Sequence, residues 1–122
     1  HLLGDGLSPP LAMQAEMLLR QRIALLSEGL EGLAKYLHLH PRALQRELSK
    51  AGTSYSALVA HIRHDQASAM LRDTVLDIDS IALKLGFSER RSFTLAFRQW
   101  QGCTPSDYRR SIRAQADQLR LK

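Results

Sequence analysis

Apolar residues recur every three or four positions along most of the chain, and this spacing predicts helices. No stretch alternates apolar and polar residues for long, and β-branched residues are sparse, so we expect no strand. The pattern predicts an all-α fold of seven helices, at about 12–26, 30–37, 41–50, 54–73, 78–85, 88–100 and from 105 onward. The expected start signals are Pro41 and Pro105 in first turns and Ser54, Asp77, Ser88 and Thr104 as N-caps.

Part of this pattern occurs twice. Residues 33–39 (LAKYLHL) match residues 81–87 (IALKLGF) in the order apolar, Ala, x, x, Leu, turn residue, apolar. The small alanine lets two helices cross closely. The turn residue needs a positive φ, which Gly86 adopts freely and His38 tolerates better than most residues. The repeat predicts two homeodomain-like helix-turn-helix subdomains, motif 1 at about 28–49 and motif 2 at about 78–101, joined by a long linker helix at 54–73.

The outward face of the second helix in each motif carries side chains of types that can read bases. Arg donates to guanine O6 and N7, Gln pairs with adenine, and a Thr methyl packs on thymine. We predict base contacts from Arg42, Gln45 and Arg46 in motif 1 and from Arg90, Arg91 and Thr94 in motif 2. The candidates for phosphate contacts are His40, Lys50 and Arg98. A linker helix of roughly 30 Å would place the motifs about one DNA turn apart, in successive major grooves.

Charge and composition indicate the same kind of partner. Seventeen Lys and Arg against twelve Asp and Glu give a formal net charge of +5, which favours nucleic acid. The single cysteine, Cys103, excludes an internal disulfide, and the five histidines complete no tetrahedral zinc set, so we expect no metal and no cofactor. No apolar run approaches the ~20 residues that cross a bilayer, and no nucleophile or carboxylate pair indicates an enzyme. Residues 1–11, with two Gly and two Pro, predict the end of a linker.

Other residues have a more ordinary expected role. We expect Arg63 to pair with Asp65 or another nearby carboxylate rather than with phosphate. A solvated helix face is expected for Arg109, Arg110 and Arg113 rather than a basic rim. The aromatic residues of motif 2, namely Phe87, Phe93, Phe97 and Trp100, are expected to be its core.

The chain resembles the C-terminal DNA-binding domain of the AraC/XylS family of bacterial transcription regulators over about residues 28–113. The first matching stretch is LAKYLHLHPRALQRELSKAGTSYSALVAHIR. The second and more diagnostic stretch is IALKLGFSERRSFTLAFRQWQGCTPSDYRR, which keeps the family's L-G-F-S and G-x-T-P-x-x-Y-R elements. The resemblance implies base contacts at the same six residues. Leu95 stands where some members have a polar or basic reader, so there it implies a contact with a thymine methyl group or none.

The resemblance also implies a biological setting. It implies a cytoplasmic transcription regulator, most often an activator, that binds double-stranded DNA and has RNA polymerase as a second partner. Residues 12–122 would then be the DNA-binding domain, and any effector ligand would bind a separate N-terminal domain. The alternative is a helical module that docks an acidic protein, such as a polymerase subunit. The length of the footprint on DNA distinguishes the two hypotheses.

Overall fold

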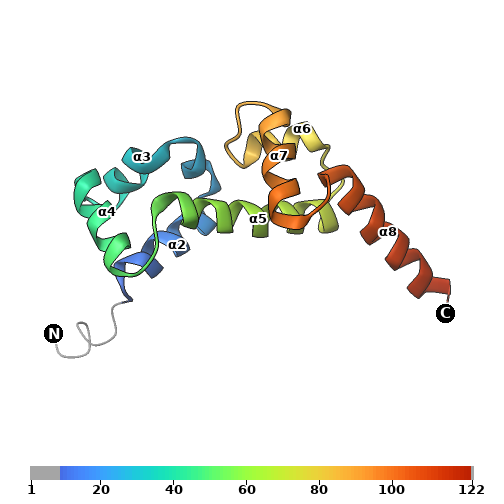
Figure 1. Ribbon diagram of the computed structural model, residues 1–122, viewed down its shortest axis with the longest axis horizontal. Helices are drawn as coiled ribbons and strands as arrows, with labels where there is room; N and C mark the ends of the chain where they lie inside the picture. The colour runs from blue at the N-terminus through green and yellow to red at the C-terminus, as the bar shows by residue number, and fades with distance from the viewer. Residues whose placement is uncertain (1–8, 122) are drawn as a thin grey trace. The chain divides into compact units, whose positions relative to one another are not determined.

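The computed structural model describes residues 9–121, which form seven α-helices, one 3-10 helix and no strand (Figure 1). In chain order these are α2 (Leu11–Gln21), η1 (Ile23–Ser27), α3 (Gly29–Tyr36), α4 (Pro41–Lys50), α5 (Tyr55–Asp73), α6 (Ile78–Lys84), α7 (Arg90–Gln101) and α8 (Pro105–Leu121). The all-α prediction is confirmed. Most of the expected linker at 1–11 lies outside the described residues. Within the described range, every helix is too short or too polar to cross a membrane.

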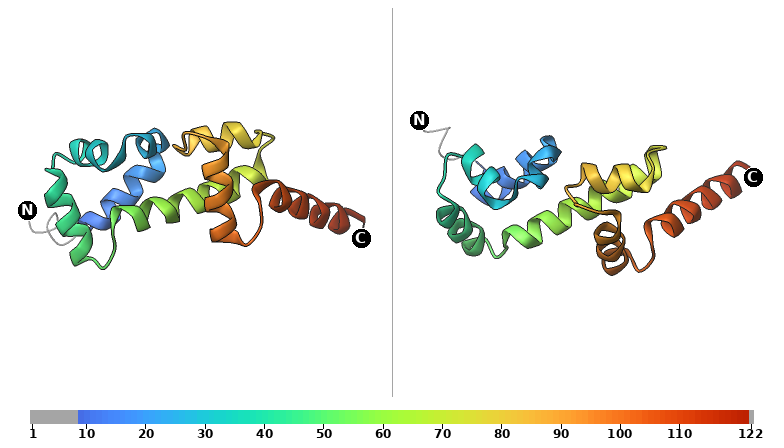
Figure 2. Two further views of the ribbon diagram at one scale, coloured as in Figure 1. Left: turned by 45° about the horizontal axis from the view of Figure 1, so that its top comes forward. Right: turned by 90° about the horizontal axis from the view of Figure 1, so that it is seen from above.

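The chain packs as two units whose boundary lies between Ile62 and Arg63, inside α5. In the first unit, α4 contacts both α2 and α3. Its core is aliphatic, and its five completely buried leucine and isoleucine side chains are Leu19, Leu33, Leu44, Leu48 and Ile62. The α3–α4 pair is therefore fixed on its inner side by the α2 helix that precedes it (Figures 1 and 2).

The second unit has an aromatic core. Phe93 and Phe97 of α7 are completely buried, and their ring centroids are 5.9 Å apart. Phe87 packs on Phe93 at 5.5 Å, and Tyr108 of α8 packs on Phe97 at 5.4 Å. The expected aromatic core is confirmed for the two α7 phenylalanines, whereas Phe87 and Trp100 are half-buried at its edge.

Most predicted helix starts are confirmed by hydrogen bonds. Ser54 Oγ accepts from the Ala57 N–H at 3.1 Å, Asp77 Oδ1 from the Ser80 N–H at 2.7 Å, and Thr104 Oγ1 from the Asp107 N–H at 3.1 Å. The predicted Ser88 cap is wrong. Glu89 is the N-cap of α7, and its side chain makes no capping hydrogen bond. The backbone is extended there (φ −147°, ψ 154°), so the helix begins one residue later than the serine signal indicates.

The predicted helix at 12–26 is also wrong in its second half. The α-helix ends at Gln21, Arg22 adopts φ −124° and ψ 75°, and a 3-10 helix follows. The apolar periodicity continues across the break, so no local signal marks it. The redirected chain buries Leu25 and Leu26, both 3% exposed, so tertiary burial outweighs the local preference for a continuous helix.

Candidate nucleic-acid interface

The two predicted turns have the same backbone hydrogen bonds. In motif 1 the Leu39 N–H donates to the Ala34 carbonyl at 2.8 Å, and His38 has a φ of 59°. In motif 2 the Phe87 N–H donates to the Ala82 carbonyl at 3.0 Å, and Gly86 has a φ of 89°. Both turns are thus Schellman motifs in which one residue in the left-handed region ends the first helix. The structural equivalence of the repeat is confirmed.

The alanines of the two motifs lie at the crossing of their helices. Ala34 is completely buried and Ala82 is 2% exposed, and the pairs α3–α4 and α6–α7 are in contact. A larger side chain at either position would separate the helices. The second helix of each motif is thereby fixed along its inner face, which leaves its outer face exposed.

In motif 1, α4 separates apolar from basic residues. Leu44 and Leu48 are completely buried, while Arg42, Gln45 and Arg46 are exposed. Within the described residues, the side chains of Arg42 and Arg46 form no hydrogen bond or ion pair. Both guanidinium groups therefore keep all their donors for a ligand.

The expected phosphate contacts of motif 1 lie at the two ends of α4. His40 is the N-cap, and its Nδ1 accepts the Arg42 N–H at 3.2 Å. This bond leaves Nε2 as the nitrogen that carries the proton of a neutral ring and can donate outward. Lys50 pairs with Glu47 at 3.1 Å, but its side chain is 71% exposed. Exposed pairs of this kind are weak, so the ammonium group can exchange its partner for a phosphate.

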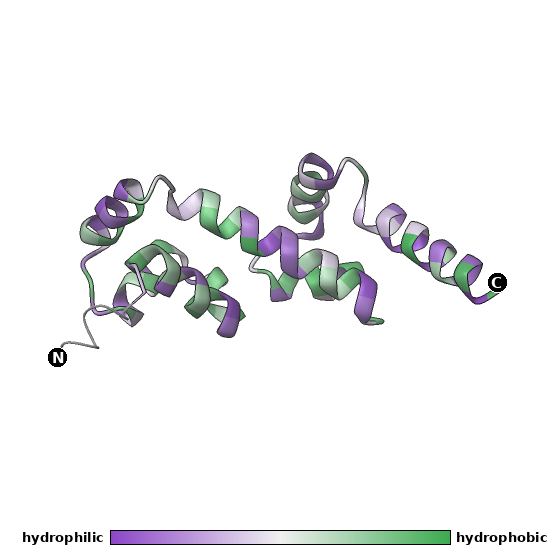
Figure 3. Cartoon of the chain, turned by 90° about the horizontal axis from the view of Figure 1, so that it is seen from below, coloured by the Kyte–Doolittle hydropathy of each residue, from purple (hydrophilic) through white to green (hydrophobic). Residues whose placement is uncertain are grey.

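In motif 2, α7 has the same two-sided arrangement (Figure 3). Phe93 and Phe97 face inward, while Arg91 and Arg98 are exposed and form no side-chain hydrogen bond or ion pair with the described residues. Thr94 is half-buried between them. Leu95 is 57% exposed, which places an apolar side chain within the outer face of α7.

Arg90 differs from the other predicted base readers. It is the first residue of α7, and its Nη1 lies 3.8 Å from the Asp79 carboxylate of α6. The side chain is 52% exposed, so this contact is weak. The guanidinium group of Arg90 thus lies between the first turn of α6 and the first turn of α7.

The two motifs differ in turn length by one residue. Two residues separate His38 from the start of α4, and three separate Gly86 from the start of α7. The turn residues His38 and Gly86 are forty-eight residues apart in the sequence. The buried pair Leu44 and Leu48, by contrast, corresponds to Phe93 and Phe97, which lie forty-nine residues later. On this register the outer faces correspond as Arg42 with Arg91, Gln45 with Thr94, and Arg46 with Leu95.

The first turns of α4 and α7 contain arginine and no acidic residue. By contrast, α3, α6 and α8 begin with Glu31, Asp79 and Asp107 in their first turns. The positive end of the helix dipole favours acidic side chains at this position, so arginine is the less stable choice in the isolated domain. With an anion bound at these helix starts, arginine would be the more stable choice.

The sequence did not reveal the role of Arg63. Its Nε donates to the Leu85 carbonyl at 2.7 Å and its Nη2 to the Gly86 carbonyl at 3.3 Å. The guanidinium carbon also lies 4.4 Å from the centre of the Phe87 ring. Arg63 of α5 thus holds the turn of motif 2 in place, a role beyond the predicted carboxylate pair.

Arg109 corrects a second expectation. It was predicted on a solvated face together with Arg110 and Arg113, but its guanidinium is half-buried and donates to four backbone carbonyls, those of Met70, Leu71, Thr74 and Leu76. Burial lowers the pKa of Arg109, and the nearby positive charge of Arg113 lowers it further. The correction applies to Arg109 alone, because Arg110 and Arg113 are exposed as predicted.

Metal ligands do not gather in the described part of the chain. Among residues 9–121, no group of three or more His, Cys, Asp or Glu side chains could hold an ion. His64, which lies three residues after His61 on the same helix, does not form a metal site with it among the described residues. Its ring stacks on that of Trp100 with 5.6 Å between the ring centroids, and its Nε2 lies 2.7 Å from Gln101 Oε1. Cys103 is a free cysteine of intermediate exposure that follows Gly102, which has a positive φ.

Comparison with known proteins identifies related sequences. A family model described as a helix-turn-helix domain matches residues 33–111, more than half of the chain. The "Ornithine utilization regulator" of Pseudomonas aeruginosa is 39% identical over 110 residues, which cover 86% of this chain and 32% of that protein. The chain spans about a third or less of the length of the curated relatives it matches.

Solved structures show the same fold. The C-terminal domain of AraT, a response regulator from Geobacillus stearothermophilus, aligns with a TM-score of 0.74 and 29% identity over 84% of this chain and 86% of that one. The DNA-binding domain of AdpA, described as a global transcriptional factor and solved with a target DNA, aligns with a TM-score of 0.73 over 91% and 99% of the two chains. At 24% identity the second likeness establishes the fold alone.

Proposed function

The chain belongs to the AraC family of helix-turn-helix transcriptional regulators, and from this membership we propose that it reads double-stranded DNA with both motifs, α4 and α7 each entering a major groove. The family is one of DNA-binding transcription regulators and not a class of enzymes. The proposal rests on the outer faces of α4 and α7, where arginines whose side chains form no hydrogen bond or ion pair with the described residues stand opposite a buried apolar pair in both motifs.

The proposed contacts divide into two kinds. We assign base contacts to Arg42, Gln45, Arg46, Arg90, Arg91 and Thr94, and phosphate contacts to His40, Lys50 and Arg98. Base contacts determine sequence preference, whereas phosphate contacts supply affinity that falls with salt. The apolar Leu95 in place of an Arg46 equivalent suggests that motif 2 reads fewer hydrogen-bonding positions than motif 1.

Selection of bound sites from a random duplex library near physiological salt tests this proposal. Two enriched blocks about 10–10.5 base pairs apart are the expected result, because two motifs on one face of DNA reach adjacent major grooves. A single block would restrict base reading to one motif. Absence of enrichment would reject sequence-specific binding and favour docking of an acidic protein.

Substitution of one reader in each motif gives the first prediction. Arg46→Ala and Arg91→Ala should each weaken binding to the selected site by about 1–3 kcal/mol and relax base preference at one position, since a bidentate contact is lost. Affinity is measured by fluorescence anisotropy on selected and random duplexes. Arg120→Ala on α8, whose side chain is 80% exposed and paired with Asp117, is the matched control and should retain the preference. Equal losses on both duplexes would show that the arginines contact phosphate instead.

The wider regulatory role is part of the same proposal. In the whole protein this domain would bring a regulator to promoters, most often to activate transcription by contact with RNA polymerase, and a separate domain would bind any effector. The regulatory name of the Pseudomonas relative supports this role. A promoter carrying the selected site upstream of a reporter gene tests the sign of regulation, and repression would contradict the activating role.

A further inference from the structure

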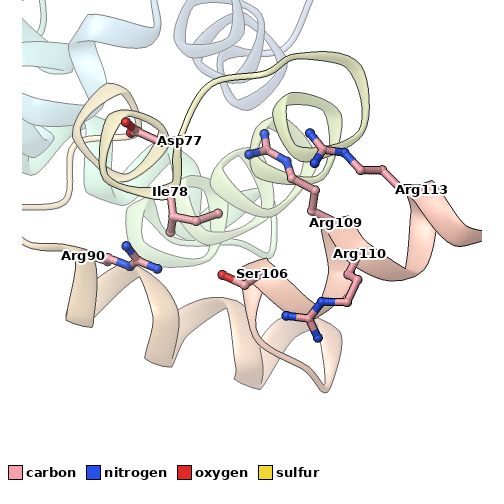
Figure 4. A pocket seen from close by; sticks show the side chains of 7 residues that line it. All are labelled: Asp77, Ile78, Arg90, Ser106, Arg109, Arg110 and Arg113. Atoms are coloured by element: carbon pink, nitrogen blue, oxygen red, sulfur yellow. The ribbon is translucent and has the colours of Figure 1, made fainter.

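A pocket of about 350 Å³ lies in the second unit beside the start of α7 (Figure 4). Asp77 and Ile78 at the start of α6 form one side, and Arg90 at the start of α7 forms another. The first turns of α8 complete the lining with Ser106, Arg109, Arg110 and Arg113. The predicted base readers Arg91 and Thr94 do not line it.

The lining is strongly basic. Four arginines and one aspartate give it a formal charge of +3, and Asp77 Oδ1 already accepts the Ser80 N–H as the cap of α6. The other acidic groups near the pocket are surface partners: Asp79 lies 3.8 Å from Arg90, and Asp107 lies 3.0 Å from Arg110. Pairs this exposed contribute little and are easily exchanged.

Two of these arginines have no carboxylate partner within the described residues. Arg109 gives its donors to backbone carbonyls, which are neutral, and Asp77 is an acidic group of the lining whose charge acts on it. Arg113 forms no hydrogen bond or ion pair there, and its charge is close enough to lower the pKa of Arg109. Asp77 offsets these two like charges only in part, because its carboxylate also caps α6, so a further anion in the pocket would stabilise them.

We propose that this arginine pocket is a binding site for a phosphate group. A phosphate offers more acceptor oxygens than a carboxylate and matches the planar donors of several guanidinium groups at once. The Ser106 hydroxyl adds a neutral donor, and the start of α8 adds the positive end of a 17-residue helix. Arg113, and Arg110 once it exchanges its exposed pair with Asp107, can close on the ligand, while Arg109 provides a fixed charge behind them.

The phosphate can come from the DNA backbone or from a free phosphate. The first source rests on the proposed function, because the pocket adjoins the start of α7 through Arg90. Two variants, Arg113→Gln and Arg110→Gln, test it. Each should reduce the slope of log affinity against log salt by about 0.9, with equal weakening on selected and random duplexes, as expected for one lost phosphate contact. Arg120→Gln removes a charge from the same helix and should leave the slope unchanged, since Arg120 forms the same i,i+3 pair outside the pocket.

The second source is tested without DNA, so its result does not depend on whether the proposed function is correct. Inorganic phosphate is titrated into the ¹⁵N-labelled chain at constant ionic strength, with chloride as the reference anion. We expect saturable shifts at the amides of Ser106, Arg110 and Arg113 and a loss of affinity of about tenfold in Arg113→Gln, the size expected for one charge-assisted contact. Circular dichroism is used to check that both variants are folded.

The two experiments together distinguish the DNA backbone from a free phosphate as the ligand of the pocket. A lower salt slope in the pocket variants alone assigns the pocket to the DNA backbone. An unchanged slope with saturable phosphate shifts assigns it to a free phosphate. If the slope is unchanged and phosphate causes no localised shifts, or if Arg120→Gln has the same effect as Arg113→Gln, the proposal is wrong. A chain that fails to select any DNA site yet binds phosphate through Arg113 would reject the proposed function and keep the pocket.

Discussion

A single guanidinium group joins the end of α5 to the loop before α6. Arg109 donates to the carbonyls of Met70 and Leu71 in the last turn of α5 and to those of Thr74 and Leu76 beyond it. The last carbonyls of a helix lack partners within it, and the helix dipole favours a cation at this end. The Met70 carbonyl also accepts from the N–H and hydroxyl of Thr74, so Arg109 adds a further donor there. Lysine has a point charge and no planar fork and cannot reproduce this contact.

Arg109→Lys is therefore expected to destabilise the second unit. Loss of the charge-assisted bonds to half-buried carbonyls should lower the free energy of unfolding by about 1–3 kcal/mol. Urea denaturation followed by circular dichroism measures the change. Arg110→Lys, an exposed neighbour, should stay within about 0.5 kcal/mol of the native chain. Equal stability of the two variants would show that the four carbonyls find other partners.

Asp77 gives a prediction that depends on pH. The Ser80 N–H that donates to its carboxylate lowers the pKa of Asp77. Because the folded pKa lies below the unfolded value of about 3.9, the stabilising effect is fully present above pH 4 and is lost as pH falls through the folded pKa. Asp77→Ala should thus melt below the native chain at pH 7, and the difference should shrink below about pH 4. Asp77→Asn retains a neutral cap, so the contribution of its cap should not change over this range.

Single-residue roles were predictable only where they depend on neighbours in sequence. The caps Ser54, Asp77 and Thr104 bond within three residues, and their signal is local. Arg63 and Arg109 instead bond to carbonyls 22 to 39 residues away, where the partner is backbone and has no sequence signature. Such contacts depend on the packing of whole helices, which is why the pattern predicted a carboxylate partner for Arg63 and a solvated helix face for Arg109.

At the scale of elements, the turns determine how α3 meets α4 and α6 meets α7. Gly86→Val should destabilise the chain, because a β-branched residue resists the φ of 89° that ends α6. A loss of about 1–2 kcal/mol, the penalty for a left-handed residue, is expected in calorimetry, with weaker DNA binding as a consequence. His38→Gly at φ 59° in motif 1 is the opposite change and should not destabilise. Native-like melting of Gly86→Val would mean that the turn adapts to the new side chain.

The same elements show where the hydrophobic pattern was sufficient. The repeat predicted both turns and the buried pairs of α4 and α7 because these features need fixed spacings. The break at Arg22 and the N-cap of α7 at Glu89 were missed, since apolar periodicity crosses the first and a better capping residue precedes the second. Element boundaries respond to tertiary packing, whereas element types follow from the pattern itself.

On the scale of the whole molecule, each unit has its own core, which is aliphatic in the first and combines aliphatic residues with two buried phenylalanines in the second. Phe93→Ala should reduce stability by about 3–5 kcal/mol through loss of a completely buried ring. We expect native-state hydrogen exchange to accelerate more in α6 and α7 than in α3 and α4, since cooperative units follow local cores. Leu44→Ala is the matched change in the first unit and should give the reverse pattern. Uniform acceleration in both variants would show one cooperative unit.

The extra residue in the turn of motif 2 limits how the two motifs can be recombined. A helix rotates by about 100° per residue. If α4 were transplanted into motif 2 with the turn residues His38 and Gly86 aligned, its side chains would be one residue out of phase. Leu44 and Leu48 would then rotate out of the aromatic core, and the arginines would no longer lie on the outer face of α7. A chimera aligned on Phe93 and Phe97 keeps both faces in phase. Engineered specificity in this scaffold should therefore be registered on the buried residues rather than on the sequence signature.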